Sequence, residues 1–184
     1  MPEAKVAYCR GRFCPVEQAN VNIRCKAFNY GLGAFEGIRG YWRNDEEQIY
    51  LFRVREHYER LKDSCRICRL RLSKSVDELV DITVELIRRN GHREDAYVRP
   101  IVYVGAETLS PVLPRDVESE LAMWTMPLGN YFSGDSGVTA IVSSWRRVAD
   151  NMIPPRAKPI AAYLNSALAR ADARDCGADE AIFL

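Results

Sequence analysis

The chain has 184 residues, of which 47% are hydrophobic, and this is enough to bury the core of one or two domains. Its 26 lysines and arginines are balanced by 25 acidic residues, so the net charge is +1, and both signs are scattered along the chain. This balance excludes the basic footprint of a nucleic-acid-binding protein and the polybasic patch of a membrane-surface protein.

The sequence also lacks the apolar segments that mark membrane and secreted proteins. No run reaches the roughly 18 apolar residues that suggest a transmembrane helix, and residues 1–5 do not open a secretory signal. We therefore expect a cytoplasmic protein. The six cysteines, Cys65-x-x-Cys68 among them, are predicted to be structural thiols. No metal site is expected, because no second Cys or His pair completes one.

The N-terminal half is predicted to form two β-hairpins and then two helices. Residues 6–8 and 13–16 flank a turn at Gly11, and residues 37–42 and 48–52 flank a turn at 44–45. Apolar residues then recur at intervals of four and three on one helical face, at Val54, Tyr58, Leu61, Cys65 and Cys68. A second helix begins at Ser75, which forms a capping-box pattern with Glu78, and it stops at Gly91.

The C-terminal half is predicted to contain more strands than helices. Strands are expected at 96–104, 121–126 and 138–143, and the glycine-rich stretch 129–137 is the best candidate for an interdomain linker. A helix follows at 161–173 and is closed by Gly177, and residues 180–184 read as a further strand. The expected class is therefore mixed α+β.

One of the five lysines lies in an unusual environment. Lys5, Lys26, Lys62 and Lys74 sit beside charges or at polar element ends, where we expect a solvated ammonium. Lys158 instead lies in Pro155-Arg156-Ala157-Lys158-Pro159-Ile160, among mostly small or apolar neighbours. Desolvation lowers the pKa of a lysine, and a neutral amine can form a Schiff base with an aldehyde. An ordinary lysine in a proline-rich loop is the commoner interpretation of this segment taken alone.

Three further features point less specifically to a ligand site. The glycines at 31, 33 and 37 do not have dinucleotide-binding spacing, and we expect them to allow tight turns near a ligand or another chain. Arg60 lies on the flank of the first helix's apolar stripe, where it faces either a cleft or solvent. Tyr97 and Arg99 share one face of a strand, an arrangement that suits a carboxylate, although such pairs more often face water.

Taken together, these segments resemble the class IV (fold type IV) aminotransferases, and most of all the branched-chain amino acid aminotransferases. The matching stretches occur in family order over almost the whole chain: Tyr30-Gly31 with Phe35-Glu36-Gly37-Ile38-Arg39, Arg55-Glu56-His57 with Arg60-Leu61, Ala96-Tyr97-Val98-Arg99-Pro100, Val142-Ser143-Ser144-Trp145, and Ala157-Lys158 with Tyr163-Leu164-Asn165-Ser166. Any one of these matches is weak, but five in order are specific.

The resemblance implies pyridoxal 5'-phosphate as the cofactor. Lys158 matches the lysine that forms the Schiff base and moves the proton, Arg60 the arginine that binds the cofactor phosphate, and Tyr163 a tyrosine beside the pyridine ring. The remaining implied roles concern the substrates, which are amino acids and 2-oxo acids. Phe35, Gly37 and Tyr131 match the apolar side-chain pocket, Tyr97 a tyrosine near the substrate carboxylate, Arg99 the arginine for the side-chain carboxylate of glutamate, and Tyr30 a tyrosine given to the partner subunit of a homodimer.

The same resemblance implies a two-domain fold. Residues 1–130 correspond to a complete small α/β open-sandwich domain, 131–137 to the interdomain linker, and 138–184 to the start of the large pseudo-barrel domain that binds the cofactor. Family members continue further and there carry the glutamate for the pyridine nitrogen and the phosphate-binding amides. We therefore expect a truncated chain with little activity of its own. Loop 106–114 departs from the commonest family pattern and leaves the substrate preference open.

The resulting hypothesis is transfer of the amino group of leucine, isoleucine or valine to 2-oxoglutarate. The nearest enzymatic alternatives are a D-amino acid aminotransferase and aminodeoxychorismate lyase, which share the cofactor lysine. An alternative of another class is a non-catalytic remnant that dimerises without cofactor.

Overall fold

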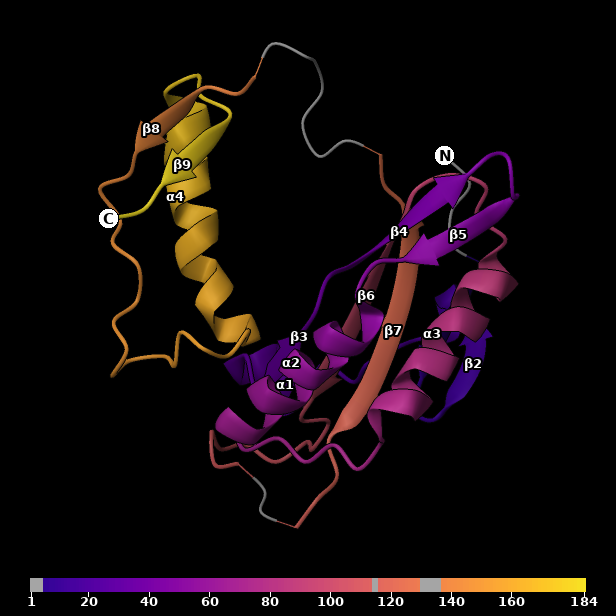
Figure 1. The fold of residues 1–184 in the computed structure, drawn as a ribbon. Helices are drawn as coiled ribbons and strands as arrows, with labels where there is room; N and C mark the ends of the chain where they lie inside the picture. The colour runs from indigo at the N-terminus through magenta and orange to yellow at the C-terminus, as the bar shows by residue number, and fades with distance from the viewer. Residues whose placement is uncertain (1–4, 114–115, 130–136) are drawn as a thin grey trace.

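The computed structural model describes residues 5–113, 116–129 and 137–184 of the chain. In these residues a seven-stranded sheet, covered on one face by two helices, is joined to a smaller C-terminal layer (Figure 1). The large sheet consists of β1 (Val6–Cys9), β2 (Arg12–Pro15), β3 (Gly33–Phe35), β4 (Ile38–Arg43), β5 (Gln48–Leu51), β6 (Ala96–Tyr103) and β7 (Glu120–Pro127). Its spatial order is β2-β1-β7-β6-β4-β5, with β3 also paired to β6, and all of these pairs are antiparallel.

The central strand β6 separates the two faces of this sheet. Val98 and Val102 are fully buried and belong to the main hydrophobic core. Tyr97 and Arg99 point to the opposite face because side chains alternate along a strand. The predicted sharing of one face by Tyr97 and Arg99 is thus confirmed.

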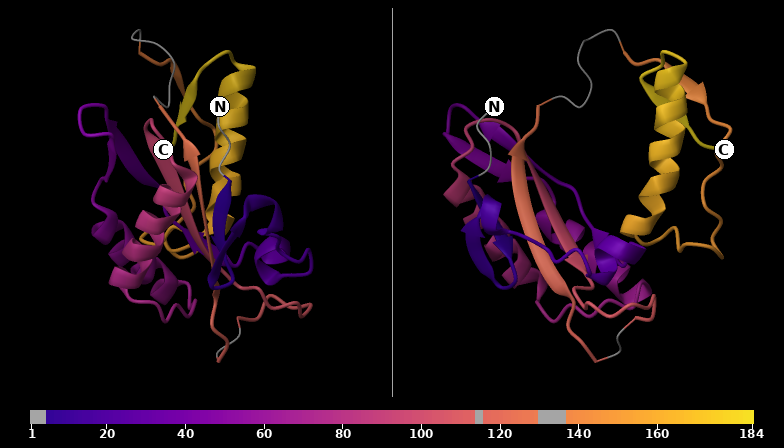
Figure 2. Two further views of the ribbon diagram at one scale, coloured as in Figure 1. Left: turned by 90° about the vertical axis from the view of Figure 1, so that its right-hand side faces the viewer. Right: turned by 180° about the vertical axis from the view of Figure 1, so that it is seen from behind.

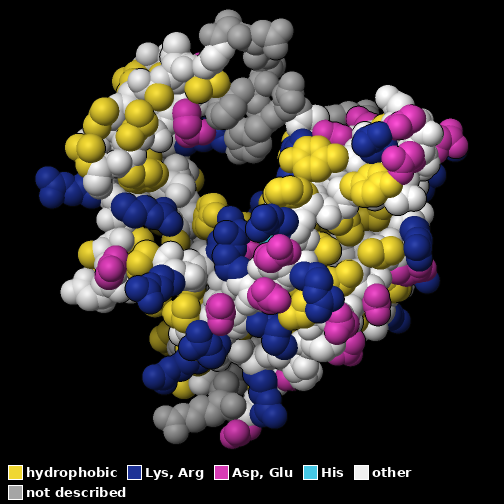
Figure 3. Space-filling view, in the orientation of Figure 1, with side chains coloured by type: hydrophobic (Ala, Val, Ile, Leu, Met, Phe, Trp, Pro, Cys, Tyr) yellow, Lys and Arg dark blue, Asp and Glu magenta, His cyan; other side chains and the backbone are white. Residues whose placement is uncertain are grey.

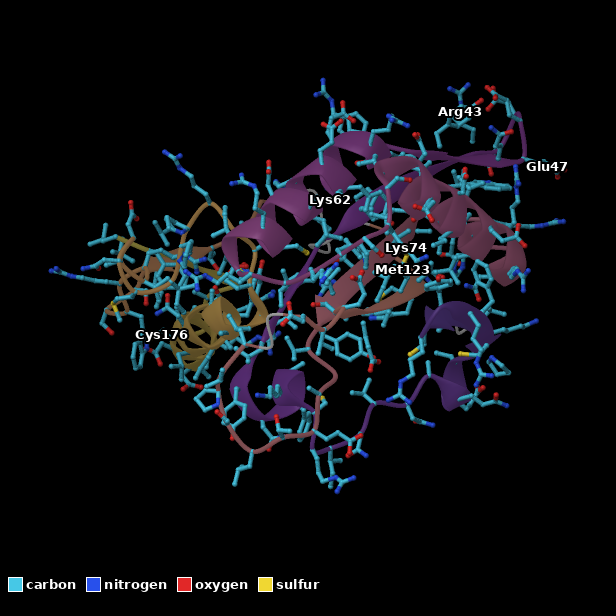
Figure 4. All side chains as sticks on the ribbon, turned by 90° about the horizontal axis from the view of Figure 1, so that it is seen from below. Arg43, Glu47, Lys62, Lys74, Met123 and Cys176 are labelled. Carbon is cyan, nitrogen blue, oxygen red and sulfur yellow. The ribbon has the colours of Figure 1, made fainter. Side chains whose placement is uncertain are left out.

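Two amphipathic helices cover the core face of the sheet, as the spacing of their apolar residues predicts. They are α2 (Val54–Ile67) and α3 (Val76–Asn90), and they bury Leu61 and Leu79 completely against the sheet. Ser75 and Glu78 form the predicted capping box at the start of α3. Figure 2 (left) shows both helices on one side of the sheet, and Figure 4 places Met123 of β7 within this packed part of the molecule.

The segment before β3 differs from the expectation. It contains two short elements that the sequence patterns do not predict, η1 (Val16–Gln18) and α1 (Lys26–Tyr30). The expected solvated ammonium at Lys26 is wrong, because Lys26 is only 4% exposed. Its Nζ donates to the carbonyl oxygens of Ser110 and Val112 at 2.8 and 2.7 Å. A buried ammonium is tolerated when backbone carbonyls replace water in this way.

The C-terminal layer is small and buries little apolar surface. It consists of two parallel strands, β8 (Ala140–Val142) and β9 (Glu180–Ile182), the turn η2 (Ile160–Ala162) and helix α4 (Tyr163–Asp175). Figure 2 (left) shows α4 on the side of the large sheet away from α2 and α3. Many hydrophobic side chains remain exposed in this layer (Figure 3), including Val138, Val142, Trp145, Met152, Leu164, Ile182 and Leu184. The low burial expected for residues 138–184 is confirmed.

The predicted domain division keeps the status of a prediction. The linker assigned to 131–137 lies, apart from Gly137, outside the described residues. Helices among the described residues fall short of the length and apolarity that crossing a membrane requires.

Candidate active site

Lys158 is fixed to the large sheet and its covering helix through its backbone. The Phe35 N–H donates to the carbonyl oxygen of Lys158 at 3.1 Å, and the Lys158 N–H donates to Ser64 Oγ at 3.1 Å. Pro159 forms an antiparallel bridge with Ala34 of β3. A residue before proline favours extended backbone, so the Lys158-Pro159 pair suits this strand-like attachment. The proline lacks an N–H, but at an isolated bridge that donor is not needed.

The ring of Phe35 brings the site residues together. The Lys158 Nζ lies 5.4 Å from the centre of this ring, and the Tyr163 ring centre lies 4.8 Å from it. The guanidinium carbon of Arg99 lies 4.2 Å from the same centre. Phe35 itself is 6% exposed, and Lys158 is half-buried. A reactive amine, a phenol and a guanidinium thus surround one buried aromatic ring.

Close approach near this ring requires small residues at two positions. Gly31 has a φ of +67°, and a Cβ there would lie 3.1 Å from the Cβ of Ala161 in η2. A Cβ on Gly37 would lie 2.5 Å from the hydroxyl of Tyr97. Side chains at either position would push Tyr97 or the segment after Lys158 away from Phe35. The expectation that these glycines permit close approach is confirmed, with other parts of the same chain as the neighbours.

Arg60 is held by a buried carboxylate. Its Nε donates to Glu36 Oε1 at 2.6 Å and its Nη2 donates to Glu36 Oε2 at 2.7 Å. His57 Nδ1 lies 3.0 Å from Glu36 Oε2. The Glu36 side chain is 0% exposed, whereas that of Arg60 is 55% exposed. Arg60 therefore faces solvent with one part and a fixed acid with another.

The ionisation of Glu36 results from two opposing effects. Burial favours the neutral acid and raises its pKa, whereas hydrogen bonds from His57 and Arg60 and the positive charge of Arg60 lower it. The hydrogen bonds and the charge prevail, and the pKa of Glu36 falls to about 2. Glu36 is consequently an anion at neutral pH.

Arg99 is held by aromatic groups instead of an acid. Its Nε and Nη2 both donate to the Tyr97 hydroxyl, at 2.8 and 2.6 Å. Its guanidinium carbon lies 5.2 Å from the Tyr97 ring centre and 5.9 Å from that of Trp124, which is the β7 residue paired with Arg99. Stacking on ring faces is favourable for an arginine. Because Tyr97 is a phenol, Arg99 keeps its full positive charge for an incoming carboxylate.

The structure brings together most of the predicted site residues. Those that surround Phe35 or lie beside its neighbours are Gly37, Arg60, Tyr97, Arg99, Lys158 and Tyr163. Tyr30 instead lines a separate hollow of about 160 Å³ together with Arg24 and Leu109. Tyr131 lies outside the described residues. Sequence reasoning gave no role to Glu36, His57 or Trp124, and only Glu36 carried a signal, as an acid between an aromatic residue and a glycine.

Comparison with known proteins identifies this arrangement. The family model described as amino-transferase class IV matches residues 33–184, which include every site residue above except Tyr30. The chain belongs to the class IV aminotransferases. The resemblance found in the sequence is therefore confirmed, and so is its fold class.

Within the class IV aminotransferases, the most similar proteins carry one name. A probable branched-chain-amino-acid aminotransferase of Aquifex aeolicus is 46% identical over 178 residues, 97% of this chain and 57% of the relative. The branched-chain aminotransferase of Thermoproteus uzoniensis, crystallised with norvaline, is 41% identical with a TM-score of 0.92, and the match covers 97% of this chain and 59% of that one. The T.th. enzyme complexed with N-(5'-phosphopyridoxyl)-L-glutamate is 33% identical, with a TM-score of 0.92, and the match covers 100% of this chain and 60% of that one.

The chain is thus a branched-chain aminotransferase homologue, and it spans less than two thirds of the length of these relatives.

Proposed function

We propose that this chain provides the lysine-bearing part of a branched-chain amino acid transaminase, which transfers the amino group of leucine, isoleucine or valine to 2-oxoglutarate. The observation that carries the proposal is the grouping around Phe35, where the Lys158 amine lies 5.4 Å from a ring that also contacts Tyr163 and Arg99. Because the relatives are longer than this chain, the activity of a whole protein is part of the proposal.

The donor set fits pyridoxal 5'-phosphate. Lys158 offers an amine for the aldehyde, Arg60 offers N–H donors for the phosphate, and Tyr163 offers a ring and a hydroxyl beside the pyridine. When bound, this cofactor supplies the electron sink that stabilises a carbanion at the substrate α-carbon. The relative complexed with a phosphopyridoxyl-glutamate adduct supports the same choice of cofactor.

The residues of this chain then act on the substrate. The Lys158 amine takes the proton from the α-carbon, and its attachment to β3 keeps it in place. Phe35, Gly37 and Tyr97 form an apolar wall suited to a branched side chain. Arg99, held at the edge of this wall, receives the side-chain carboxylate of glutamate, so two different substrates use one pocket.

The remaining proposals concern assembly and domains. Tyr30 lies away from the Phe35 group, which is compatible with its proposed contribution to the pocket of a partner subunit in a homodimer. Tyr131 is proposed for the apolar pocket. Residues 1–130 are proposed as the small domain, 131–137 as the linker, and 138–184 as the start of the cofactor-binding domain.

Borohydride reduction tests the central proposal. The chain is incubated with pyridoxal 5'-phosphate, reduced and digested, and the modified lysine is located by mass spectrometry. We expect the pyridoxyl group on Lys158, its loss in Lys158→Ala, and its retention in the matched control Lys62→Ala, since Lys62 lies on α2 and donates to the Lys74 carbonyl oxygen. Modification of another lysine, or of none, would overturn the assignment; an unmodified chain that still dimerises would support the non-catalytic alternative.

A further inference from the structure

We propose that Glu36 is a positioning residue that aims Arg60 at the cofactor phosphate. The inference rests on the proposed function, because the anion in question is the phosphate of pyridoxal 5'-phosphate. It assigns a role to an acid that does not itself touch the cofactor and acts only through the arginine.

The hydrogen bonds determine which edge of Arg60 is available. A guanidinium has five N–H donors in a fixed plane. Glu36 accepts from Nε and from one N–H of Nη2, at 2.6 and 2.7 Å, in a two-point contact with the side edge of the plane. The end edge, with both N–H groups of Nη1 and the second N–H of Nη2, is not used by this contact. That edge has the two parallel donors that suit a phosphate.

Glu36 is a rigid support for this contact. Its carboxylate is 0% exposed and is approached by His57 Nδ1 at 3.0 Å and by the Gly37 N–H at 3.3 Å. Its backbone N–H donates to the carbonyl oxygen of Pro100 at 3.0 Å, which ties it to β6. A carboxylate fixed from three sides cannot follow Arg60, so Arg60 must adopt the orientation that Glu36 imposes.

Stability alone gives little reason for this pair. Burying a carboxylate carries a large desolvation cost, and a well-packed apolar residue often serves a core better. Arg60, with a side chain 55% exposed, could be solvated without a buried partner. The Glu36 hydrogen bonds and, more weakly, the Tyr163 phenol raise the pKa of Arg60. Arg60 therefore lies within electrostatic range of a residue of the Phe35 group.

Arg99 shows the same arrangement with a different acceptor. Its Nε and Nη2 are also occupied, by the Tyr97 hydroxyl, and its end edge is likewise left for a ligand. Two arginines on different elements, α2 and β6, are thus held by the same edge. Holding the guanidinium before the ligand arrives reduces the entropy lost on binding.

A comparison of two ligands tests the role of Glu36. The affinities of pyridoxal 5'-phosphate and of phosphate-free pyridoxal are measured by absorbance titration on the wild-type chain, Glu36→Gln, Arg60→Lys and the double variant. We expect Glu36→Gln to weaken binding of the phosphorylated ligand about tenfold or more and to leave pyridoxal almost unchanged. The double variant should lose no more than Arg60→Lys alone, because Glu36 acts through Arg60. Asp63→Asn, which removes an exposed ion pair on the same helix, is the matched control.

Equal loss of both ligands in Glu36→Gln, or additive losses in the double variant, would overturn the proposal, since either indicates a general structural role. If Glu36→Gln does not fold, Glu36→Asp replaces it, with the same shift in the ratio of the two affinities expected.

If the wild-type chain takes up no cofactor on Lys158, the proposed function fails, and inorganic phosphate decides the fate of Glu36 separately. The probe is the NMR signal of the Arg60 Nε–H group. A phosphate-dependent shift in the wild type that is lost in Glu36→Gln supports the positioning role, and the absence of a shift overturns it.

Discussion

The large sheet with its two helices and the C-terminal layer are stabilised to very different degrees. In the first, α2 and α3 place Tyr58, Leu61, Leu79 and Leu86, all 0% exposed, against β6 and β7. In the second, α4 fully buries only alanines, Ala169 and Ala173, while Leu164 and Ile182 stay 69% and 52% exposed. Hydrophobic stabilisation scales with the apolar area removed from water. The large sheet is therefore the stable framework, and the site lies where the weaker layer is attached to it.

Core truncation should give the largest contrast between the two parts. Leu79→Ala is expected to lower the free energy of unfolding by about 3 kcal/mol, because it removes a fully buried side chain and leaves a cavity. Leu164→Ala removes the same atoms from an exposed position and should change it by less than about 0.5 kcal/mol. Urea unfolding of both variants measures this, and similar losses would contradict the proposed difference.

Acid should weaken the framework through Glu36. The pKa of Glu36 is about 2 in the folded chain, below its ordinary value of 4.5, so its contribution is complete above pH 4.5 and is lost as the pH falls toward 2. We expect a loss of about 2 kcal/mol, less than the full shift implies because solvent screens the half-exposed Arg60. Urea unfolding between these pH values should show a steeper decline for the wild type than for Glu36→Gln, and parallel profiles would refute the assignment.

Removal of one helix cap should have a smaller effect. Ser75→Ala deletes the oxygen that accepts from the Glu78 N–H at 3.1 Å, and a loss of about 1 kcal/mol is expected. Ser73→Ala, two residues earlier and outside the helix, serves as the control and should have almost no effect. Equal thermal shifts for the two variants would show that the capping box contributes little.

The smallest effect is expected in the C-terminal layer. Trp145→Phe removes the hydrogen bond from the indole Nε1 to Asp172 at 2.9 Å, which is exposed to solvent. An exposed hydrogen bond competes with water, so the expected loss is about 0.5 kcal/mol. A loss larger than that of Ser75→Ala would mean that this layer depends on few contacts and is more cooperative than its burial indicates.

Much of the framework could be predicted from local patterns, because local chemistry determines it. The apolar spacing of α2 and the capping box at Ser75 act within a few residues of themselves. Helix α1 and strand β3 were missed because they are five and three residues long, too short to show a period. Lys26 was misjudged because its acceptors, Ser110 and Val112, lie more than eighty residues away.

The site was predictable only where motifs coincide with chemistry. Lys158 stands out by its apolar neighbours, and Arg99 by sharing a face with Tyr97. Glu36 gives no comparable signal, because its partners His57 and Arg60 come from a helix that follows after a whole hairpin. Trp124 reaches Arg99 only through the pairing of β6 with β7. Contacts of this kind depend on strand register, which single-sequence patterns do not define.

The attachment of Lys158 to β3 and α2 has a consequence for motion. The two hydrogen bonds of the Lys158 backbone, to Phe35 and to Ser64, join residues 137–184 to the large sheet and its covering helix. If the C-terminal layer rocks as a unit, the axis of that rotation passes near these bonds, and atoms near an axis travel least. Helix α4 and the β8–β9 pair would then swing through the widest arc, while the reactive nitrogen stays nearly stationary beside Phe35.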